Sequence, residues 1–379
     1  MKIEQKRWFP EKGWQGESAA DIAGQAQLVF VFGDRQALET GGNFDRIKEF
    51  YPRAHIVGCS SSGEISGSEV TDGCLAVTAV VFERARVEVA SVRIEGPDKS
   101  REAGEKLAGL LNPSGLDHVM IFSDGLLVNG SELVRGLKKR LTANVGVTGG
   151  LAGDGTLFQR TLVCCGDAPE SGKIAAVGFY GPGIKIGFGS MGGWVPFGPE
   201  RTVTRSQGNV LFELDGAPAV ELYKKYLGEE ADDLSANRFY FPLSLRLNEG
   251  ESGVVRTILA VNEQDKSLTF AGDIPQGTPA RLMKAKFEML VDGSAQAAHT
   301  ASRAMGSPSP DLAILFSCVG RKIVLKQRVE EEVECVRKAF GPRSALTGFY
   351  SYGEIGPFDR SGQCQLHNQT MTITAISED

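Results

Sequence analysis

The stretch that decides the fold is the loop GCSSSGEI at residues 58–65, which returns as GFYSYGEI at residues 348–355. Apolar residues at periods of two and of three to four predict the same order of elements around both loops: a strand and a helix before the loop and a further strand after it, with a short extra strand before the loop in the first copy. The predicted elements are strand 28–32, helix 44–50, strand 55–58 and strand 75–82 in one copy, and strand 312–317, helix 329–340 and strand 370–376 in the other. The chain therefore contains a repeated β-α-β-β unit.

A third, looser copy of this unit occupies residues 119–165. In this copy Gly153-Asp154-Gly155 takes the place of the Gly-Glu-Ile sequence of the other two loops. Three such units predict an α/β fold in which mixed β-sheets are covered by helices, with the glycine-rich loops gathered at corresponding strand ends. We expect these loops to surround a common recess.

The segment between the copies has a different pattern. Two apolar runs, at 174–180 and 184–190, flank Gly181-Pro182-Gly183 and predict a hairpin, and further antiparallel strands follow. Pro218 then begins a helix that ends at Gly228. We therefore predict two domains, at residues 25–216 and 217–379.

Composition limits the class of protein. The 379 residues include 41 basic and 47 acidic ones, a net charge of −6, and the basic residues are dispersed, so we expect no nucleic acid as a partner. The seven cysteines form no CxxC pair, which favours a reducing, cytoplasmic location. The N-terminus lacks the apolar core of a signal peptide, and the apolar runs are far shorter than the roughly 20 residues of a membrane span, so we expect no membrane association.

Catalytic motifs are missing from the sequence. It has no P-loop, HExxH or GxSxG sequence, and the residues after Gly187-Phe-Gly189-Ser-Met-Gly192 contain two prolines, which cannot begin the helix of a dinucleotide site. A nucleophile such as Cys59 or Cys318 would need a base nearby, and the chain has only four histidines. We therefore predict that the protein is not an enzyme, with an unknown enzymatic reaction as the alternative.

Several polar residues are candidates for ligand binding. Glu64, Asp154 and Glu354 occupy corresponding loops, where they could accept hydrogen bonds from a ligand or cap tight turns through backbone N–H groups. Arg321 could bind an anionic group or pair with one of the glutamates at 330–334. His367 precedes the last strand, where its imidazole could ligate a metal or haem iron, with Asn368 orienting it or a ligand, or simply bond within its own turn.

Longer motifs make the sequence resemble the FIST family over residues 25–376, as an N-terminal FIST part followed by a C-terminal FIST part. The motifs are GGLAGDG (149–155), GWVPFG (193–198), VTRSQGN (203–209), FSCVGR (316–321), GFYSYGEIGP (348–357) and LHNQT (366–370).

The resemblance implies an intracellular sensory protein that binds a small ligand and signals to a partner protein. Some stand-alone bacterial members resemble the NosP group, which are haem proteins that sense nitric oxide and modulate a histidine kinase of a two-component system. This implies haem b held by an imidazole, for which we choose His367 because it is the one histidine inside a family-like motif. The alternative is a small organic ligand such as an amino acid, held by the glycine-rich loops with Glu64 or Glu354 supplying charge.

Overall fold

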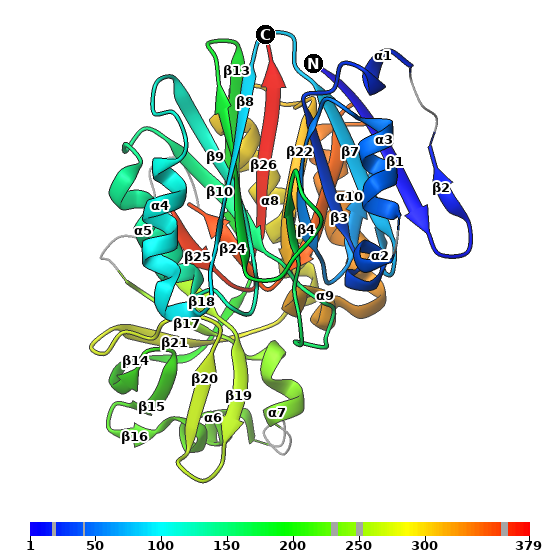
Figure 1. Ribbon diagram of the computed structural model, residues 1–379. Helices are drawn as coiled ribbons and strands as arrows, with labels where there is room; N and C mark the ends of the chain where they lie inside the picture. Colours follow the sequence, from blue (N-terminus) through cyan, green and yellow to red (C-terminus); the bar gives the residue numbers. More distant parts are fainter. Residues whose placement is uncertain (17–19, 41, 229–233, 248–252, 358–362) are drawn as a thin grey trace.

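A computed structural model describes residues 1–16, 20–40, 42–228, 234–247, 253–357 and 363–379. The chain forms a large α/β core and a smaller, mostly β domain that is inserted into it (Figure 1). Three six-stranded sheets form the core, and the smaller domain has a sheet of its own. The predicted fold class, mixed sheets covered by helices with repeated units in two domains, is confirmed.

Three consecutive units build the core. The first consists of β1 (Lys2–Phe9), β2 (Gly13–Gln15), α1 (Ala20–Ala23), β3 (Leu28–Gly33), α2 (Arg35–Glu39), α3 (Asn43–Phe50), β4 (His55–Ser60), β5 (Glu64–Ser66), β6 (Glu69–Thr71) and β7 (Leu75–Val81). The second consists of β8 (Arg86–Arg93), α4 (Ser100–Gly109), β9 (Leu116–Ser123), α5 (Gly130–Arg140), β10 (Gly146–Leu151), β11 (Val163–Cys165) and β12 (Lys173–Tyr180).

The third unit is interrupted by the smaller domain. It consists of β13 (Ile184–Met191), α8 (Phe287–Met305), β22 (Leu312–Cys318), α9 (Val319–Leu325), α10 (Val329–Phe340), β23 (Ala345–Ser351), β24 (Gly353–Gly356), β25 (Gln365–His367) and β26 (Met371–Glu378). The inserted domain consists of β14 (Val195–Gln207), β15 (Val210–Leu214), β16 (Ala217–Pro218), α6 (Ala219–Leu227), α7 (Leu234–Asn237), β17 (Leu243–Leu245), β18 (Val254–Arg256), β19 (Ile258–Asn262), β20 (Ser267–Phe270) and β21 (Pro279–Lys284).

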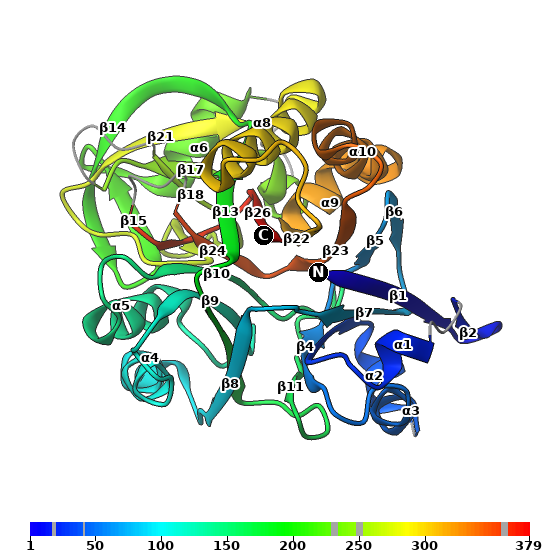
Figure 2. The ribbon, with the colours of Figure 1, turned by 90° about the horizontal axis from the view of Figure 1, so that it is seen from above.

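The three core sheets have the same topology. Each contains a parallel pair, β3 with β4, β9 with β10, or β22 with β23, and the first strand of the pair also lies antiparallel to the last strand of its unit. The strand after each loop leaves its own unit and extends the sheet of another: β5 pairs with β23, β24 with β10, and β11 with β4. Viewed from above, the sheets surround a common centre and the helices lie outside them (Figure 2).

Phenylalanines from all three units fill that centre. Phe32, Phe122 and Phe316 occupy corresponding places in β3, β9 and β22, and all three are fully buried. Their ring centroids are 5.7 Å apart for Phe32 and Phe122, and 6.1 Å apart for Phe122 and Phe316. Phe349 packs 4.9 Å from Phe32 and 5.6 Å from Phe316. One aromatic cluster therefore joins the inner faces of the three sheets.

The predicted hairpin at 174–190 is wrong. β12 lies between β8 and β9 in the second sheet, whereas β13 pairs with β26 in the third. The short connection carries the chain from one unit to the next because both strands find other partners. Gly187 and Gly189 of the GxGxxG sequence lie under α8, where an added Cβ would stand 2.1 Å from the Ala301 oxygen and 2.4 Å from the Ala297 oxygen, so these glycines serve helix-strand packing.

Candidate functional site

The three glycine-rich loops meet and close a ring of backbone hydrogen bonds. In each loop one residue donates its backbone N–H to a backbone carbonyl in the loop of another unit. The donor lies four positions after Gly58, Gly149 or Gly348, and the acceptor lies two positions after the corresponding glycine of the other loop. The bonds are Ser62 N to Tyr350 O (2.8 Å), Gly153 N to Ser60 O (3.0 Å) and Tyr352 N to Leu151 O (3.0 Å). The predicted gathering of the loops at corresponding strand ends is thus what the structure has.

Glu64 and Glu354 play matching structural parts beside this ring. Glu354 accepts hydrogen bonds from Ser351 Oγ (2.5 Å), Thr370 N (3.2 Å) and Thr370 Oγ1 (3.0 Å). Glu64 accepts bonds from Ser61 Oγ and from Cys74 N (3.4 Å). Burial raises the pKa of both carboxyl groups to about 8, despite these hydrogen bonds. Both side chains therefore tie a loop to the start of the last strand of the unit.

Asp154 organises the loop that follows it. Its carboxylate accepts three backbone N–H bonds of 2.9 Å, from Phe158, Gln159 and Arg160, and a bond from the Tyr352 hydroxyl. Phe158 is held with a left-handed backbone (φ 53°), and its ring stacks on Tyr352 at 4.5 Å between centroids. Asp154 thus caps a turn, and in doing so it fixes two aromatic side chains.

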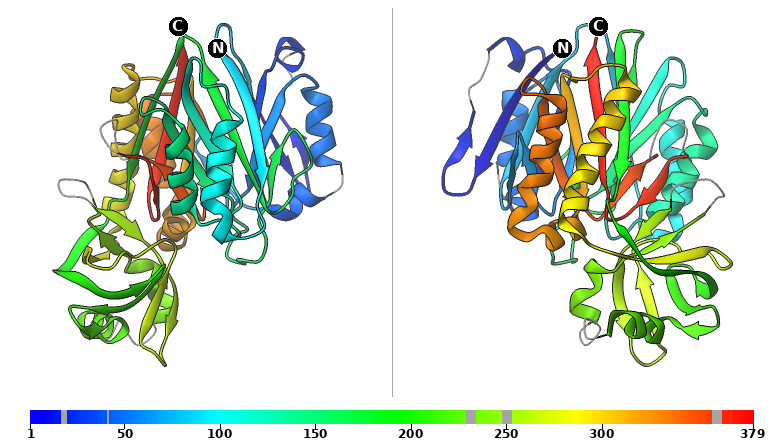
Figure 3. Two further views of the ribbon diagram at one scale, coloured as in Figure 1. Left: turned by 60° about the vertical axis from the view of Figure 1, so that its left-hand side comes forward. Right: turned by 180° about the vertical axis from the view of Figure 1, so that it is seen from behind.

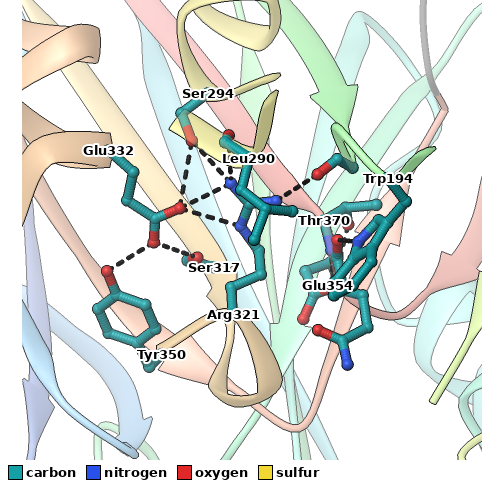
Figure 4. Close-up of polar contacts among 11 residues, drawn as sticks. Trp194, Leu290, Ser294, Ser317, Arg321, Glu332, Tyr350, Glu354 and Thr370 are labelled. Atoms are coloured by element: carbon teal, nitrogen blue, oxygen red, sulfur yellow. Dashed lines mark hydrogen bonds and ion pairs between the residues drawn. The ribbon is translucent and has the colours of Figure 1, made fainter. Parts of the chain in front are cut away.

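Arg321 lies in a buried polar cluster rather than on a ligand-binding surface (Figure 4). Its guanidinium pairs with Glu332 at 2.7 Å, and both side chains are 0% exposed. The remaining donors reach Gly192 O (2.5 Å), Leu290 O (2.8 Å) and Ser294 Oγ (3.0 Å). Of the two alternatives for Arg321, the structure shows pairing with one of the glutamates at 330–334, which is Glu332.

Glu332 completes this cluster from α10. Its other oxygen accepts bonds from Tyr350 Oη (2.7 Å) and Ser317 Oγ (2.9 Å), so the pair is satisfied on both sides. Buried charges that are fully hydrogen-bonded hold their elements in fixed positions, and removing one partner is costly. The cluster joins α8, α9, α10 and the ends of β22 and β23.

His367 and Asn368 are both buried. His367 Nε2 lies 2.6 Å from the Gly356 oxygen, to which only an N–H can donate, and burial lowers the pKa of the imidazole to about 4. Neither amide atom of Asn368 has a hydrogen-bond partner among the described residues. The His367 ring is enclosed and lines none of the three cavities described below.

Three of the cavities formed by the described residues lie around the core. The interface cavity, of about 410 Å³, lies between the core and the inserted domain. Its lining includes Gly130, Phe158, Phe270, Asp273 and Tyr352. The Trp194 cavity, also of about 410 Å³, lies between α8 and the inserted domain. The edge cavity, of about 880 Å³, lies beside β13 and the start of β10. Figure 3 shows the inserted domain below the core.

The six predicted site residues line none of these cavities, but two of them support residues that do. Tyr352, which bonds Asp154, lines the interface cavity, and Thr370, which bonds Glu354, lines the Trp194 cavity. Sequence reasoning missed Phe158, Tyr352 and Asp273 as cavity residues. Phe158 closely follows the GDG loop and Tyr352 belongs to a repeated loop, so the sequence pattern could have marked both as candidate cavity residues. No pattern in the sequence marks Asp273.

Asp273 is the charged residue among the described residues that line the interface cavity, and two arginines lie close to this part of the wall. The N-terminus of α5 faces it through Gly130, and the N-cap residue Asn129 bonds Asp273 Oδ1 at 3.2 Å. Asp273 also pairs with Arg135 at 3.2 Å. The guanidinium of Arg256 lies directly behind Gly272, and burial lowers its pKa to about 10, so it stays charged at neutral pH.

Family comparisons agree with the motifs found in the sequence. A model described as "FIST N domain" matches residues 27–217, and one described as "FIST C domain" matches residues 219–357. The chain belongs to the FIST family. FIST domains are sensory domains for small ligands in signal transduction. The interface cavity of this FIST protein is lined from both matched segments, by Phe158 of the first and by Asp273 and Tyr352 of the second.

A relative and a solved structure were also found. An uncharacterised protein of Methanocaldococcus jannaschii is 23% identical over 356 residues, which cover 86% of this chain and 66% of that protein, so the FIST protein spans about two thirds of this relative. A crystal structure of cyanuric acid hydrolase from A. caulinodans is similar over 78% of this chain and 99% of that one, at 10% identity. Its TM-score of 0.19 is too low to carry any argument about fold or activity.

The cysteines considered as nucleophiles lie inside the protein. Cys59 and Cys318 are buried, and burial raises their pKa values, so both stay protonated and poorly nucleophilic at neutral pH. Among the described residues, no group of three or more His, Cys, Asp or Glu side chains could hold a metal ion. The described helices include none with the length and apolar character that a membrane crossing requires.

Proposed function

We propose that this FIST protein is a sensor that binds a small zwitterion, such as an amino acid, in the interface cavity. The observation that carries the proposal is a cavity of about 410 Å³ that is lined by both family segments and combines aromatic walls with the carboxylate of Asp273 and the N-terminus of α5. Ligand pockets in proteins commonly lie at domain interfaces and pair apolar walls with a few polar groups.

Each part of an amino acid has a partner of suitable chemistry in this cavity. The N-terminus of α5, an eleven-residue helix, favours a carboxylate, and the positive charge of Arg256, which lies behind Gly272 and not in the lining, adds to the positive field. Asp273 favours an ammonium group. Phe158, Phe270 and Tyr352 offer an apolar surface for the side chain. This arrangement replaces Glu64 and Glu354 with Asp273 as the carboxylate that meets the ligand.

Signalling would follow from the position of the cavity between the core and the inserted domain. A ligand that contacts both stabilises one relative arrangement of the two, and a partner protein can recognise that arrangement. A histidine kinase as that partner, and a cytoplasmic location, stay predictions from the family resemblance.

Thermal-shift measurement with each of the common amino acids tests the proposal. A ligand at 100 times its dissociation constant adds about 2.7 kcal/mol to the free energy of unfolding, which raises the melting temperature by several degrees. We expect Asp273→Asn to abolish the shift, and Asp45→Asn, which removes the same charge from an exposed site on α3, to leave it intact. If no amino acid raises the melting temperature, or if Asp273→Asn responds like the wild type, the proposal is wrong.

Haem binding has a separate test. An absorption spectrum of protein purified from haem-replete cells would show a Soret band if haem were bound, and the buried imidazole of His367 leads us to expect none that depends on this residue. A Soret band that disappears in His367→Ala would restore the haem-sensor interpretation.

A further inference from the structure

The LHNQT segment joins β25 to β26 and is hydrogen-bonded to the inserted domain near both of its ends. Arg256 Nη1 donates to Leu366 O at 2.8 Å. Gln369 Nε2 donates to Phe239 O at 3.1 Å. Trp194, in the connection from β13 to β14, donates from Nε1 to Gln369 O at 2.7 Å. The inserted domain is therefore fixed directly against this segment of the core.

The LHNQT segment is also bonded to the loops that form the hydrogen-bonded ring. Its last residue, Thr370, donates to Glu354 through its N–H and its hydroxyl, at 3.2 and 3.0 Å (Figure 4). Glu354 in turn accepts a bond of 2.5 Å from Ser351 Oγ. Ser351 directly precedes Tyr352, whose N–H is one of the three ring donors. A shift of the segment therefore reaches the ring through Glu354.

Gln369 has a left-handed backbone at a place where the other two units have glycine. Its φ is 60°, against 73° at Gly73 and 70° at Gly172. Each of the three lies two positions before the corresponding residue of β26, β7 or β12 that pairs with the end of β22, β3 or β9. A Cβ makes this conformation costly, whereas glycine adopts it freely. Gln369 is therefore strained, and its contacts have to hold it in place.

The side chain of Gln369 is enclosed between the core and the inserted domain. The residue is 0% exposed, and a Cβ added to Gly320 of α9 would stand 2.6 Å from both Nε2 and Oε1 of its amide. Gly320 does not have a positive φ, so the close approach of this amide is what requires glycine there. The amide is thus held between α9 and Phe239.

Asn368, beside Gln369, is buried without its normal hydrogen bonds. It is 0% exposed, and neither atom of its amide has a partner among the described residues. Buried amides are nearly always bonded, and an unmet group costs free energy. A strained residue and an unbonded one therefore stand side by side. The segment itself does not favour this conformation, and its contacts with the inserted domain maintain it.

An apolar cluster keeps the two parts of the protein in contact at this place. Its members include Trp194, Phe239 and Val255 on the side of the inserted domain, and Leu290 and Val324 in the core. Close-packed side chains transmit a displacement rather than absorb it. A shift of the inserted domain therefore moves the groups that hold the LHNQT segment.

We propose that the LHNQT segment is a conformational relay: the inserted domain holds it in a strained state, and a shift of that domain lets it relax and alters the ring of loops through Glu354. This inference goes beyond the proposed function, because it names the part of the core that responds. It holds whatever ligand moves the inserted domain.

The strain is tested by the melting temperatures of Gln369→Gly and Gln369→Ala. Both variants lose the bond to Phe239 O, but only alanine has a Cβ in the left-handed conformation. We expect the glycine variant to melt higher, by about 2 °C. At Gly109, in α4, the order should be reversed, with the alanine variant melting above the wild type. An equal or reversed order at Gln369 would show that the residue is not strained and would overturn the proposal.

Hydrogen–deuterium exchange of the full chain, with no ligand added, tests the relay. Trp194→Phe removes only the indole N–H, and Gly320→Ala displaces the Gln369 amide. We expect each to raise exchange about five-fold, the value of one hydrogen bond of about 1 kcal/mol, in both the LHNQT segment and the loop at 349–354. Thr370→Val, which removes the hydroxyl bond to Glu354, should reduce the response of the loop to Trp194→Phe.

The outer helix α3 is the control for that measurement, and its exchange should not change. Circular dichroism establishes that each variant is folded, and Trp194→Phe carries the test if Gly320→Ala fails to fold. A response confined to the LHNQT segment would make the segment an anchor only, and a response of equal size in α3 would make the effect global. Either outcome would overturn the proposal. Because no ligand is used, neither outcome depends on amino acid binding, which the thermal-shift measurement tests separately.

Discussion

At the scale of single residues, the polar side chains that stand out in the sequence hold the frame of the site rather than its surface. Asp154 bonds Tyr352, and Glu354 bonds Thr370, and in each pair only the second residue lines a cavity. Substitutions at these carboxyl groups should therefore mainly change the stability of the protein. They should change ligand binding only indirectly, through the residues that the carboxyl groups position.

Glu354→Gln tests the buried carboxyl group through the pH dependence of stability. Because the folded-state pKa of Glu354 is about 8, against 4.5 for the ordinary side chain, the folded protein retains a proton that the unfolded chain has lost between these values. The free energy of unfolding therefore falls as pH rises through this window, by up to about 1.4 kcal/mol per pH unit for each such group. Urea unfolding at pH 6.5 and pH 8 should show a smaller fall in the variant, which has no proton to lose.

Glu64, His118 and His367 also contribute to the pH dependence of stability, so the measurement has to account for them. Glu64 has the same raised pKa, so Glu64→Gln should remove a similar part of the pH dependence, and the double variant most of it. Starting at pH 6.5 limits the opposite contribution of His118 and His367, whose lowered pKa values make stability rise with pH below that point. Glu11→Gln, at an exposed position, is the control, and equal pH slopes in all variants would contradict the buried-carboxyl interpretation.

Asp154→Asn should loosen the loop that carries Phe158. An amide has one acceptor oxygen where the carboxylate offers two, so at least one of the three backbone bonds is lost, at a cost of about 2 kcal/mol. We expect lower hydrogen-exchange protection at residues 158–160 and weaker binding in the interface cavity. Tyr352→Phe removes the hydroxyl bonds to the Asp154 carboxylate and Gly155 O (3.2 Å) and from Asp154 N (3.2 Å), but it leaves the three backbone bonds to the Asp154 carboxylate in place and should have a smaller effect on the same amides. Unchanged protection in Asp154→Asn would show that the loop is held by other contacts.

At the scale of elements, the repeated glycines explain why the loops are so alike. An added Cβ at Gly58, Gly149 or Gly348 would stand about 2 Å from a carbonyl oxygen of the neighbouring parallel strand, at 1.8, 2.1 and 2.0 Å respectively. The three oxygens belong to Val31, Ile121 and Leu315, which are corresponding residues of β3, β9 and β22. The glycine is therefore a requirement of strand approach in every unit.

Gly58→Ala and Gly348→Ala should both be strongly destabilising. The new methyl group has to displace backbone, so we expect a loss of about 3 kcal/mol or more in the free energy of unfolding. Gly109→Ala is a matched control in α4, where the methyl group meets nothing within 4 Å. This substitution should raise the free energy of unfolding by about 0.5–1 kcal/mol. Denaturant unfolding measures all three, and a loss below about 1 kcal/mol at Gly58 would mean that the parallel strands can separate without cost.

The sequence predicts elements and repeats well because both depend on local pattern. Strands at 28–32 and 312–317 and the helix through Val333, Val336 and Phe340 follow from apolar periodicity, and the structure confirms them. Which sheet a strand joins depends on partners far along the chain, which is why the predicted hairpin at 174–190 is wrong and the exchange of β5, β11 and β24 does not follow from the sequence pattern. The same limit hid the interface cavity, whose walls come from Pro97 to Tyr352.

At the scale of the whole molecule, strand exchange makes the core a closed assembly. Each unit lends a strand to another, in the cycle first to third, third to second and second to first. The ring of loop hydrogen bonds repeats this cycle at one end, and the phenylalanine cluster joins the three sheets through their inner faces. A unit separated from the others would lose both a strand of its sheet and its share of the cluster, so the three units should unfold together.

Phe122→Ala tests this cooperativity at the centre of the core. Phe122 is fully buried and lies within 6.4 Å of Phe30, Phe32, Phe316 and Phe349, so its removal should cost about 3–5 kcal/mol. If the core is one cooperative unit, the slowest-exchanging amides of β3, β9 and β22 should all lose the same amount of protection, because all exchange through the same global opening. Ile47→Ala, in the outer helix α3, is the comparison for a buried residue that packs on one sheet. A loss confined to β9 and its neighbours in Phe122→Ala would show instead that each sheet opens independently, and that strand exchange does not couple them.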